Sequence, residues 1–307
     1  MRRFVIALAA FGLFAVACAA SSSSVVQSPG GGSQAAPADA AACAQQNAAA
    51  FVNAGRLTVG TDNPAYPPYF GGGTTKTHPD WKVNDPYTGK GFESAVAYEV
   101  AKRLGFTSDQ VDWVVAPFNQ TYKPGPTSYD FAIEQISYSP KRAEAVDFSD
   151  SYYDEAQAVV AVKGTPIAGA ASIADLKPYK LAAPIGTTSF DLIQNVVGST
   201  PAGFTTLNDT VQAVNAGQVD GLVVDLPTAL YLADPYVQEV KNSVVVGQFP
   251  LAGTPEHFGM TFAKGDTLVA CVNQALAEMK GDGTLDTLTT TWLSKKTNVG
   301  EVPVFAP

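Results

Sequence analysis

Apolar residues follow two different spacings along residues 56–293, and the two spacings alternate. Short apolar runs that end in polar residues or glycine predict strands over 56–62, 110–116, 156–163, 179–186, 220–225 and 242–249. Apolar residues at helical spacing predict helices over 95–105, around 189–197, and over 209–216, 227–233, 268–281 and 283–293. Strands that alternate with helices are typical of parallel sheets in an α/β fold.

Polar side chains lie at the ends of three of these strands, 56–62, 179–186 and 220–225, and at the end of the segment YDFAIEQI (129–136). They are Asp62, Ser137, Thr188 and Asp225. In open α/β sheets, ligands bind at the carboxyl ends of the strands, where loops lead into helices. The spacing therefore predicts that these four residues lie at a binding site.

Arg142 lies in the first turn of a helix predicted to start at Ser139 and Pro140, which suit the cap and the first position. The free N–H groups already make a helix N-terminus positive, so this is a poor place for a cation. One interpretation is a solvated charge, or a pair with Glu144 or Asp147. The other is an anion site, because a guanidinium fits a carboxylate with two hydrogen bonds.

A second helix N-terminus is expected in GTTSFDLIQNVV, with Thr188 or Ser189 as its cap, and it would add donors for the same anion. Asp225 follows the apolar run GLVV and either binds an ammonium or only caps the next helix. A receptor for an anion beside a receptor for a cation specifies a zwitterion. The head group of an amino acid is such a zwitterion.

Composition narrows the possible functions. The 307 residues are 46% hydrophobic and carry a net charge of −9, whereas nucleic-acid binding requires clustered positive charge. His78 and His257 stand alone, without the Cys/His spacing of a metal site, and neither a GxSxG nor a Walker motif is present. We therefore expect no nucleic acid, no metal and no cofactor.

The N-terminus is typical of an exported protein. Residues 1–17 are predicted to be a signal peptide, and Ala15-Val16-Ala17-Cys18 resembles a bacterial lipobox, which predicts lipid attachment at Cys18 on the outer face of the cytoplasmic membrane. The alternative is ordinary cleavage and secretion. Residues 18–42 are expected to form a flexible tether. Cys43 and Cys271 remain, and they form either a disulfide or two buried thiols.

Several stretches together resemble the family-3 bacterial extracellular solute-binding proteins, the amino-acid-binding branch of the receptors of ABC transporters. The stretches are LTVGTDNPAYPPY, GFESAVAYEVAKRLG, ISYSPKRAEAVDFSDSYY, IADLKPYKLAAPIGTTS, AVNAGQVDGLVVDLPTALYLA and CVNQALAEMKGDGTLDTL. The resemblance implies a two-lobed periplasmic-binding-protein-like fold of type II, with the ligand between the lobes and two hinge strands crossing between them. One lobe would comprise residues 43–160 plus 254–307, and the other residues 161–253.

The resemblance also implies roles for individual residues. Arg142 corresponds to the arginine that holds the ligand carboxylate, assisted by Ser137 and Thr188, and Asp225 corresponds to the acid that binds the ammonium. Tyr66 resembles the aromatic residue that covers the ligand, and Asp62 an acid near the ligand side chain. The partners implied are a free amino acid and a membrane permease, with the chain as a monomer.

The chain departs from the family around the expected side-chain pocket. FNQTYKPGPTSYDFA contains prolines and a glycine that exclude a regular helix, and Glu134 and Gln135 stand where small residues are common. If Asp62 and Glu134 both line the pocket, they favour a ligand with a polar or cationic side chain. Alternatively, Glu134 pairs with Lys141 and the pocket is neutral. A different function, suggested by dehydratases that resemble this fold, is turnover of a cyclic carboxylic acid with Glu134 as acid–base group.

Overall fold

The computed structural model describes residues 38–251, 256–294 and 301–307, which all fall within one compact unit. The predicted signal peptide, residues 1–17, and the predicted lipid-attachment residue Cys18 lie outside the described residues. Across the part of the chain that is described, no helix combines the length and the apolar character needed to cross a bilayer.

The described residues begin inside the segment predicted to be a tether. Helix α1 (Ala40–Gln46) starts after Asp39, whose side chain accepts a hydrogen bond of 2.8 Å from the backbone N–H of Ala42. Residues 40–42 are therefore helical rather than part of a flexible tether. A disulfide joins Cys43 in α1 to Cys271 in α8, so the prediction of a bridge between the start of the fold and a late helix is confirmed.

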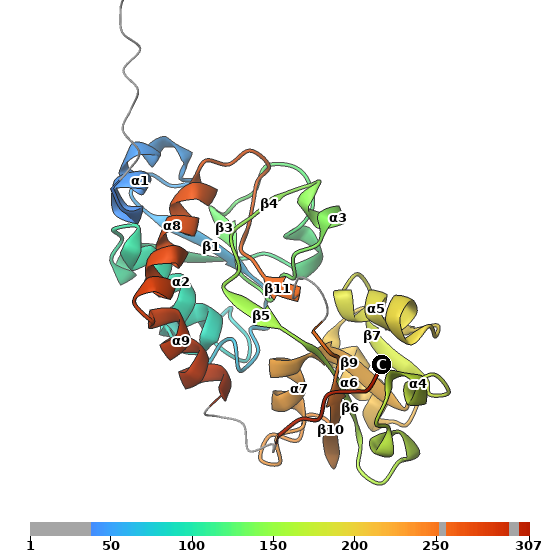
Figure 1. Cartoon of the computed structure of the whole chain (residues 1–307). Coiled ribbons are helices and arrows are strands. Elements are labelled where there is room, and N and C mark those ends of the chain that lie inside the picture. The colour runs from blue at the N-terminus through green and yellow to red at the C-terminus, as the bar shows by residue number, and fades with distance from the viewer. Residues whose placement is uncertain (1–37, 252–255, 295–300) are drawn as a thin grey trace, which may run out of the picture. The chain divides into compact units, whose positions relative to one another are not determined.

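The first lobe is built on a five-stranded sheet (Figure 1). Its strands, in spatial order, are β2 (Val111–Val115), β1 (Leu57–Thr61), β3 (Phe131–Ala132), β12 (Thr261–Phe262) and β4 (Asp147–Phe148). The lobe also contains α1, α2 (Phe92–Arg103), α3 (Pro140–Ala143), α8 (Leu268–Gly281) and α9 (Thr284–Thr289), which continues as a π-helical turn over Thr290–Ser294. Short 3₁₀ turns lie at Ala48–Ala50, Pro86–Thr88, Ser108–Gln110 and Phe118–Gln120.

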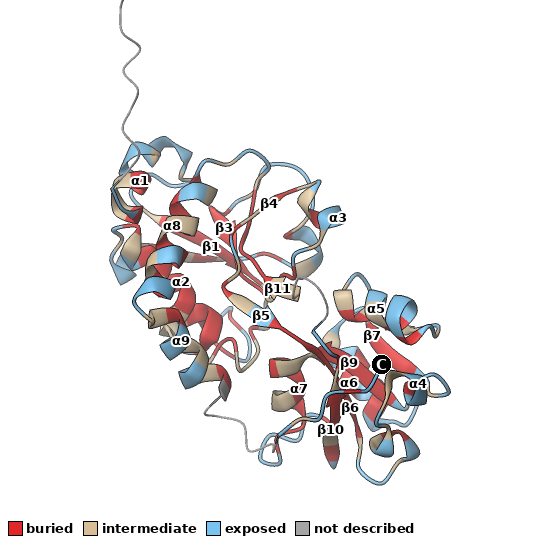
Figure 2. Cartoon of the chain, in the orientation of Figure 1, coloured by how far each residue is buried: buried red, intermediate tan, exposed pale blue. Residues whose placement is uncertain are grey.

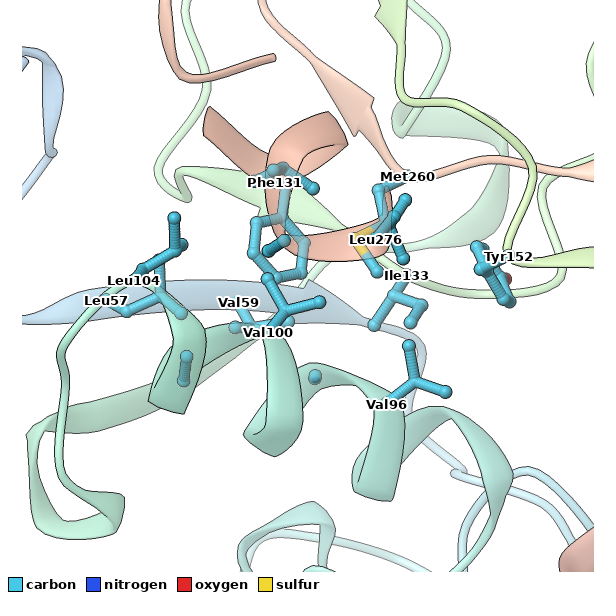
Figure 3. Packing of buried hydrophobic residues seen from close by; sticks show 14 of the residues in the cluster. Leu57, Val59, Val96, Val100, Leu104, Phe131, Ile133, Tyr152, Met260 and Leu276 are labelled. Atoms are coloured by element: carbon cyan, nitrogen blue, oxygen red, sulfur yellow. The ribbon is translucent and has the colours of Figure 1, made fainter. Parts of the chain in front are cut away.

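The core of the first lobe lies between its sheet and its helices. Figure 3 shows Val96 and Val100 of α2 pointing toward the sheet, where Val59 of β1 and Phe131 of β3 meet them. All four side chains are fully buried. Because α2 carries Glu93 in its first turn and Lys102 and Arg103 in its last, its charged residues also complement the helix dipole.

The second lobe is built on a second five-stranded sheet (Figure 1). Its strands, in spatial order, are β10 (Ser243–Gln248), β6 (Gln157–Val162), β9 (Gly221–Asp225), β7 (Leu181–Pro184) and β8 (Ala202–Phe204). Its helices are α4 (Ile173–Leu176), α5 (Thr188–Leu192), α6 (Leu207–Asn215) and α7 (Leu226–Leu232), with a 3₁₀ turn at Pro166–Gly169 and a π-helical turn at Ile193–Val197. Figure 2 shows that the strands of this sheet are mostly buried, whereas the helices also carry exposed residues.

A two-stranded antiparallel sheet forms the connection between the lobes. It pairs β5 (Tyr153–Glu155) with β11 (Glu256–Phe258), and β5 leads directly into β6 of the second lobe. In the second lobe, β6 runs antiparallel to its neighbour β9. In the first lobe, β12 runs antiparallel to β3 and β4, so both large sheets are mixed, whereas the alternation of strands and helices had predicted parallel sheets.

The segment 301–307 lies against the second lobe. Gln248 at the end of β10 exchanges backbone hydrogen bonds with Pro303 and Phe305, at 2.8 and 2.9 Å, and the ring of Phe305 packs against Phe249 in the core of that lobe. The sequence had assigned residues 254–307 to the first lobe. For 301–307 the assignment is wrong, because Phe305 is an apolar anchor that the second lobe buries.

Candidate functional site

Arg142 lies where the sequence placed it, at the N-terminus of α3. Pro140 occupies the first helical position, and Ser139 Oγ accepts a hydrogen bond of 3.2 Å from the backbone N–H of Arg142. The capped helix therefore begins as predicted.

The guanidinium of Arg142 is turned into the protein. The residue is 7% exposed and donates to the carbonyl of Ser137 at 2.7 Å and to the carbonyl of Gly186, in the second lobe, at 2.9 Å. Asp147 pairs instead with Lys264 at 2.7 Å. The interpretation of Arg142 as a solvated charge or a partner of Asp147 is therefore wrong. A guanidinium has three N–H donors beyond these two, and the hydroxyl of Tyr122 is a further hydrogen-bonding neighbour.

Two aromatic rings cover the guanidinium. Its Cζ lies 4.4 Å from the ring centre of Tyr122 and 5.4 Å from that of Phe118, distances at which a cation is attracted to a ring face. Burial lowers the pKa of Arg142, and the acidic groups around it oppose that effect. The segment 117–129, which carries both rings, forms a three-residue 3₁₀ turn and bends rather than a regular helix, as its prolines and glycine predicted.

Asp225 ends β9 and precedes α7, but its side chain makes no capping hydrogen bond to that helix. It accepts a hydrogen bond of 2.7 Å from the side-chain amide of Gln157. Burial raises the pKa of Asp225 to about 6 and the nearby Glu256 adds to the increase, whereas hydrogen bonds with Glu155 and Gln157 and the charge of Arg142 lower it. The interpretation of Asp225 as a plain helix cap is therefore wrong.

Thr188 is the first residue of α5, and the cap is its neighbour Thr187, whose Oγ1 accepts from the N–H of Phe190 at 3.2 Å. The prediction of Thr188 or Ser189 as cap is thus wrong by one residue. Freed from capping, the hydroxyl of Thr188 lies 3.4 Å from Ser137 Oγ and 3.5 Å from Gln157 Nε2. Ser137 is in the first lobe, so its contact with Thr188 joins the two lobes.

Asp62 and Glu134 are two further acidic residues, and their carboxyl groups lie close enough to interact. Asp62 follows β1 and accepts a hydrogen bond of 2.8 Å from the N–H of Asn63. Glu134 is 5% exposed, and its Oε2 has no hydrogen-bonding partner among the described residues. Burial raises the pKa of both carboxyl groups, and the charge of Asp62 raises that of Glu134 further. Lys141 is exposed, so the internal pair between Lys141 and Glu134 is not formed.

Gln135 is held by Glu93. Its backbone has a left-handed φ of 48°, and its N–H donates to Glu93 Oε1 at 2.7 Å, while its side-chain amide donates to the other oxygen of the same carboxyl. Tyr152 also donates to Glu93. Burial raises the pKa of Glu93 to about 7 against the opposing effect of these donors.

Tyr66 and Gln135 line a cavity of about 70 Å³ between the first lobe and helices α6 and α7. A hydrogen bond of 3.0 Å between Tyr69 Oη and Thr228 Oγ1 joins the lobes beside it. Burial raises the pKa of Tyr66, and the charges of Glu239 and Asp62 contribute. Tyr66 therefore lies in the same acidic surroundings as Asp62.

The sequence-predicted residues thus fall into two groups. Hydrogen-bond contacts connect Ser137, Arg142, Thr188 and Asp225, and electrostatic contacts or the cavity connect Asp62, Glu134, Gln135 and Tyr66. Sequence reasoning missed Glu93, Tyr122, Glu155, Gln157 and Glu256. A signal existed for two of them, because Glu155 and Gln157 are polar residues at alternate positions directly before the apolar run of β6.

The first lobe supplies the guanidinium donors of Arg142, and the second lobe supplies the carboxyl group of Asp225. The hinge strands β5 and β11 add the carboxyl groups of Glu155 and Glu256. Two α/β lobes, joined by a hinge and completing one polar site between them, define the class of two-lobed solute-binding proteins.

The chain belongs to the bacterial extracellular solute-binding proteins, family 3, whose model matches residues 72–295. The L-cystine-binding protein TcyA of Bacillus subtilis (strain 168) is 30% identical over 253 residues, which cover 80% of this chain and 84% of TcyA.

Two solved structures are similar to this chain. An ancestral arginine-binding protein bound to arginine is 28% identical, with a TM-score of 0.63, over 78% of this chain and 99% of that protein. The ancestral amino acid-binding protein AncCDT-1, a precursor of cyclohexadienyl dehydratase, is 30% identical, with a TM-score of 0.62, over 78% and 96%. The expected α/β, two-lobed fold is confirmed.

Proposed function

We propose that this protein is the extracytoplasmic substrate-binding protein of an ABC importer. It captures a free amino acid between its lobes and delivers it to a membrane permease. Arg142 binds the carboxylate of the ligand, assisted by Ser137 and Thr188, and Asp225 binds the ammonium.

One observation carries this proposal: a buried guanidinium and a buried carboxyl from different lobes act on the same space. Arg142 on α3 and Asp225 at the end of β9 are close enough that each charge affects the pKa of the other group. A zwitterion would bridge them and would favour the closed arrangement, because only closure completes both halves of its site.

The acidic pair Asp62 and Glu134 supports a polar or cationic ligand side chain. Glu134 Oε2 is buried without a hydrogen-bonding partner among the described residues, and an unpaired buried polar atom is costly. An ammonium or guanidinium on the ligand would satisfy it, whereas an acidic side chain would be repelled. Tyr66 covers the ligand from the adjacent cavity, and Gln135 contributes its amide.

Export follows from the same function. Residues 1–17 direct secretion, and lipid attached to Cys18 holds the chain, as a monomer, at the outer face of the cytoplasmic membrane beside its permease. Mass spectrometry of the protein purified from membranes tests this directly. A diacylated or triacylated N-terminal Cys18 is expected, and an unmodified N-terminus would contradict the anchor.

Calorimetric titration with each common amino acid and with cystine tests the binding function. We expect saturable binding of one or a few amino acids, with arginine, lysine, cystine or glutamine ahead of glutamate. In the Arg142→Met variant the Kd should rise about 100-fold or more, since a buried charge partner is lost. Arg56→Met is the matched control, because Arg56 lies on the surface and pairs with Asp112.

The outcomes separate the claims. If glutamate binds more tightly than the cationic amino acids, the assignment of the acidic pair is wrong but the receptor function stands. If Arg142→Met and Arg56→Met bind equally well, Arg142 does not hold the carboxylate. If folded, ligand-free protein binds nothing in the panel, the amino-acid function fails.

A dehydratase activity is the second candidate, since burial favours the protonated form of Glu134 that a general acid requires. Incubation with cyclic hydroxy-carboxylic acids, followed by ultraviolet absorbance, tests it. Turnover that is lost in Glu134→Gln would establish the enzyme.

A further inference from the structure

The side-chain amide of Gln157 lies in an unusual group of oxygen atoms. Its Nε2 is 2.7 Å from Asp225 Oδ1, 3.0 Å from Glu155 Oε1, 3.5 Å from Glu256 Oε2 and 3.5 Å from Thr188 Oγ1. A primary amide is neutral and has only two N–H donors. Its two donors cannot satisfy three carboxyl groups and a hydroxyl, although the hydroxyl of Ser137 also reaches Glu155 Oε1, at 3.4 Å.

Two of these carboxyl groups also keep an oxygen atom without a hydrogen-bonding partner. Glu155 is 1% exposed, and its Oε2 is buried and unpartnered among the described residues, as is Oε1 of Glu256. Glu155 and Glu256 stand directly opposite each other in the β5–β11 ladder. Two ionised carboxyl groups in that position would destabilise the strand pair, and buried unpaired carboxyl groups are costly.

A primary ammonium matches this group of oxygens better than the amide does, because it has three N–H donors and a full positive charge. We propose that Glu155 and Glu256 bind the ligand ammonium together with Asp225, and that the Gln157 amide competes with it for the same oxygens. This inference rests on the proposed function, since it requires a ligand that carries an ammonium group. It assigns the ammonium site to the hinge strands as well as to the second lobe.

The charges around Glu155 lead to a second expectation, which is that ligand binding releases protons. The groups that face Glu155 are Asp225 from β9, Glu256 from β11, Gln157 from β6, Tyr153 from β5, Tyr69 and the hydroxyl of Ser137. Arg142 from α3 acts on Asp225 and Glu256, and Asp225 in turn acts on Glu93 from α2. Burial raises the pKa of Glu155, and the charges of Asp225 and Glu256 raise it further. An arriving ammonium lowers the pKa of these carboxyl groups, so protons pass to the solvent on binding.

Calorimetry at pH 7, in two buffers of different ionisation enthalpy, measures both the Kd and the number of protons released. The probe is the amino acid that binds most tightly in the panel, alongside its analogue without the α-amino group (5-guanidinopentanoic acid for arginine). Wild type is compared with Glu155→Gln, Glu256→Gln and Gln157→Met. Exposed Glu301→Gln is the control, and thermal melting confirms that each variant is folded.

For the wild type, we expect proton release with the amino acid and none with the analogue. Glu155→Gln and Glu256→Gln should each weaken binding of the amino acid about tenfold or more and reduce the proton release, because a charge-assisted hydrogen bond is lost. Gln157→Met should strengthen binding, since the competitor is removed.

Each contrary result would overturn one part of the proposal. Equal Kd values for Glu155→Gln, Glu256→Gln and Glu301→Gln would remove the hinge carboxyl groups from the ammonium site. Weaker binding by Gln157→Met would make Gln157 a support for Asp225 rather than a competitor. Binding of no amino acid by the wild type would overturn the proposed function itself, a result distinct from both.

Discussion

Replacing Glu93 with Gln should change how the stability of this protein depends on pH. Glu93 is fully buried at the start of α2 and accepts hydrogen bonds from Gln135 and Tyr152. Glutamine has nearly the same shape but does not ionise. The variant therefore removes one titrating group while leaving the packing in place.

The magnitude follows from the two pKa values of this carboxyl group. Its pKa is about 7 in the folded protein and 4.5 as the reference for the unfolded chain. A raised pKa means that the folded state holds its proton more tightly, so this contribution is fully present below pH 4.5 and is lost as the pH rises through 7. Between pH 5 and pH 8 the loss amounts to about 2–3 kcal/mol of the free energy of unfolding.

Urea unfolding at pH 5 and pH 8, followed by tryptophan fluorescence, measures the effect. We expect the difference in unfolding free energy between the two pH values to shrink by about 2–3 kcal/mol in Glu93→Gln relative to wild type. The pH dependence that remains in the variant comes from other buried carboxyl groups, such as Asp130, whose pKa is raised to about 6 by burial. The exposed Glu301→Gln variant should keep the wild-type pH dependence.

An unchanged pH dependence in Glu93→Gln, with the fold intact, would refute this reasoning. It would mean that the three hydrogen-bond donors fully offset the burial of the carboxylate. In that case Glu93 is ionised throughout the range and holds Gln135 as a carboxylate.

Two further predictions concern stability. The double variant Cys43→Ala, Cys271→Ala should lower the free energy of unfolding by about 3–5 kcal/mol in denaturant titration, since the disulfide closes a loop across 228 positions; a loss under about 1 kcal/mol would contradict this. Phe305→Ala should cost about 3–5 kcal/mol because a fully packed ring is removed, whereas Val304→Ala, at a residue 58% exposed, should stay within about 0.5 kcal/mol. Equal effects of the two variants would show that Phe305 does not anchor the segment.

Long periodic segments could be predicted from the sequence, and very short ones could not. Helix α8 covers residues 268–281, the bounds that its apolar spacing predicted, because fourteen residues display the helical period several times. Strands β3, β4 and β12 have two residues each, and β5 and β11 have three. Such strands exist because a neighbouring strand pairs with them, and no local pattern encodes that partner.

Residues of the site could be predicted from the sequence where they lie at the end of a strand or at the start of a helix. Arg142 stood out because a cation is unfavourable in the first turn of a helix, and Asp225 stood out because it directly follows an apolar run. The cap could not be assigned within the run Thr187-Thr188-Ser189, since each residue is a good cap by itself. No pattern in the sequence pointed to Glu256, because its role depends on Glu155, which lies opposite it in the pair of strands β5 and β11.

The segment 301–307 has a consequence for self-association. Strand β10 stands at the end of its sheet, and an uncovered end strand offers free N–H and C=O groups to any other chain. Pro303 and Phe305 occupy these groups at Gln248, the last residue of β10, and the carbonyl of Ala306 accepts from the N–H of Ile173 in α4. The segment thus covers the end of β10, where another copy of the chain could otherwise pair with this sheet. Fusions or truncations that displace this segment should therefore produce strand-paired dimers.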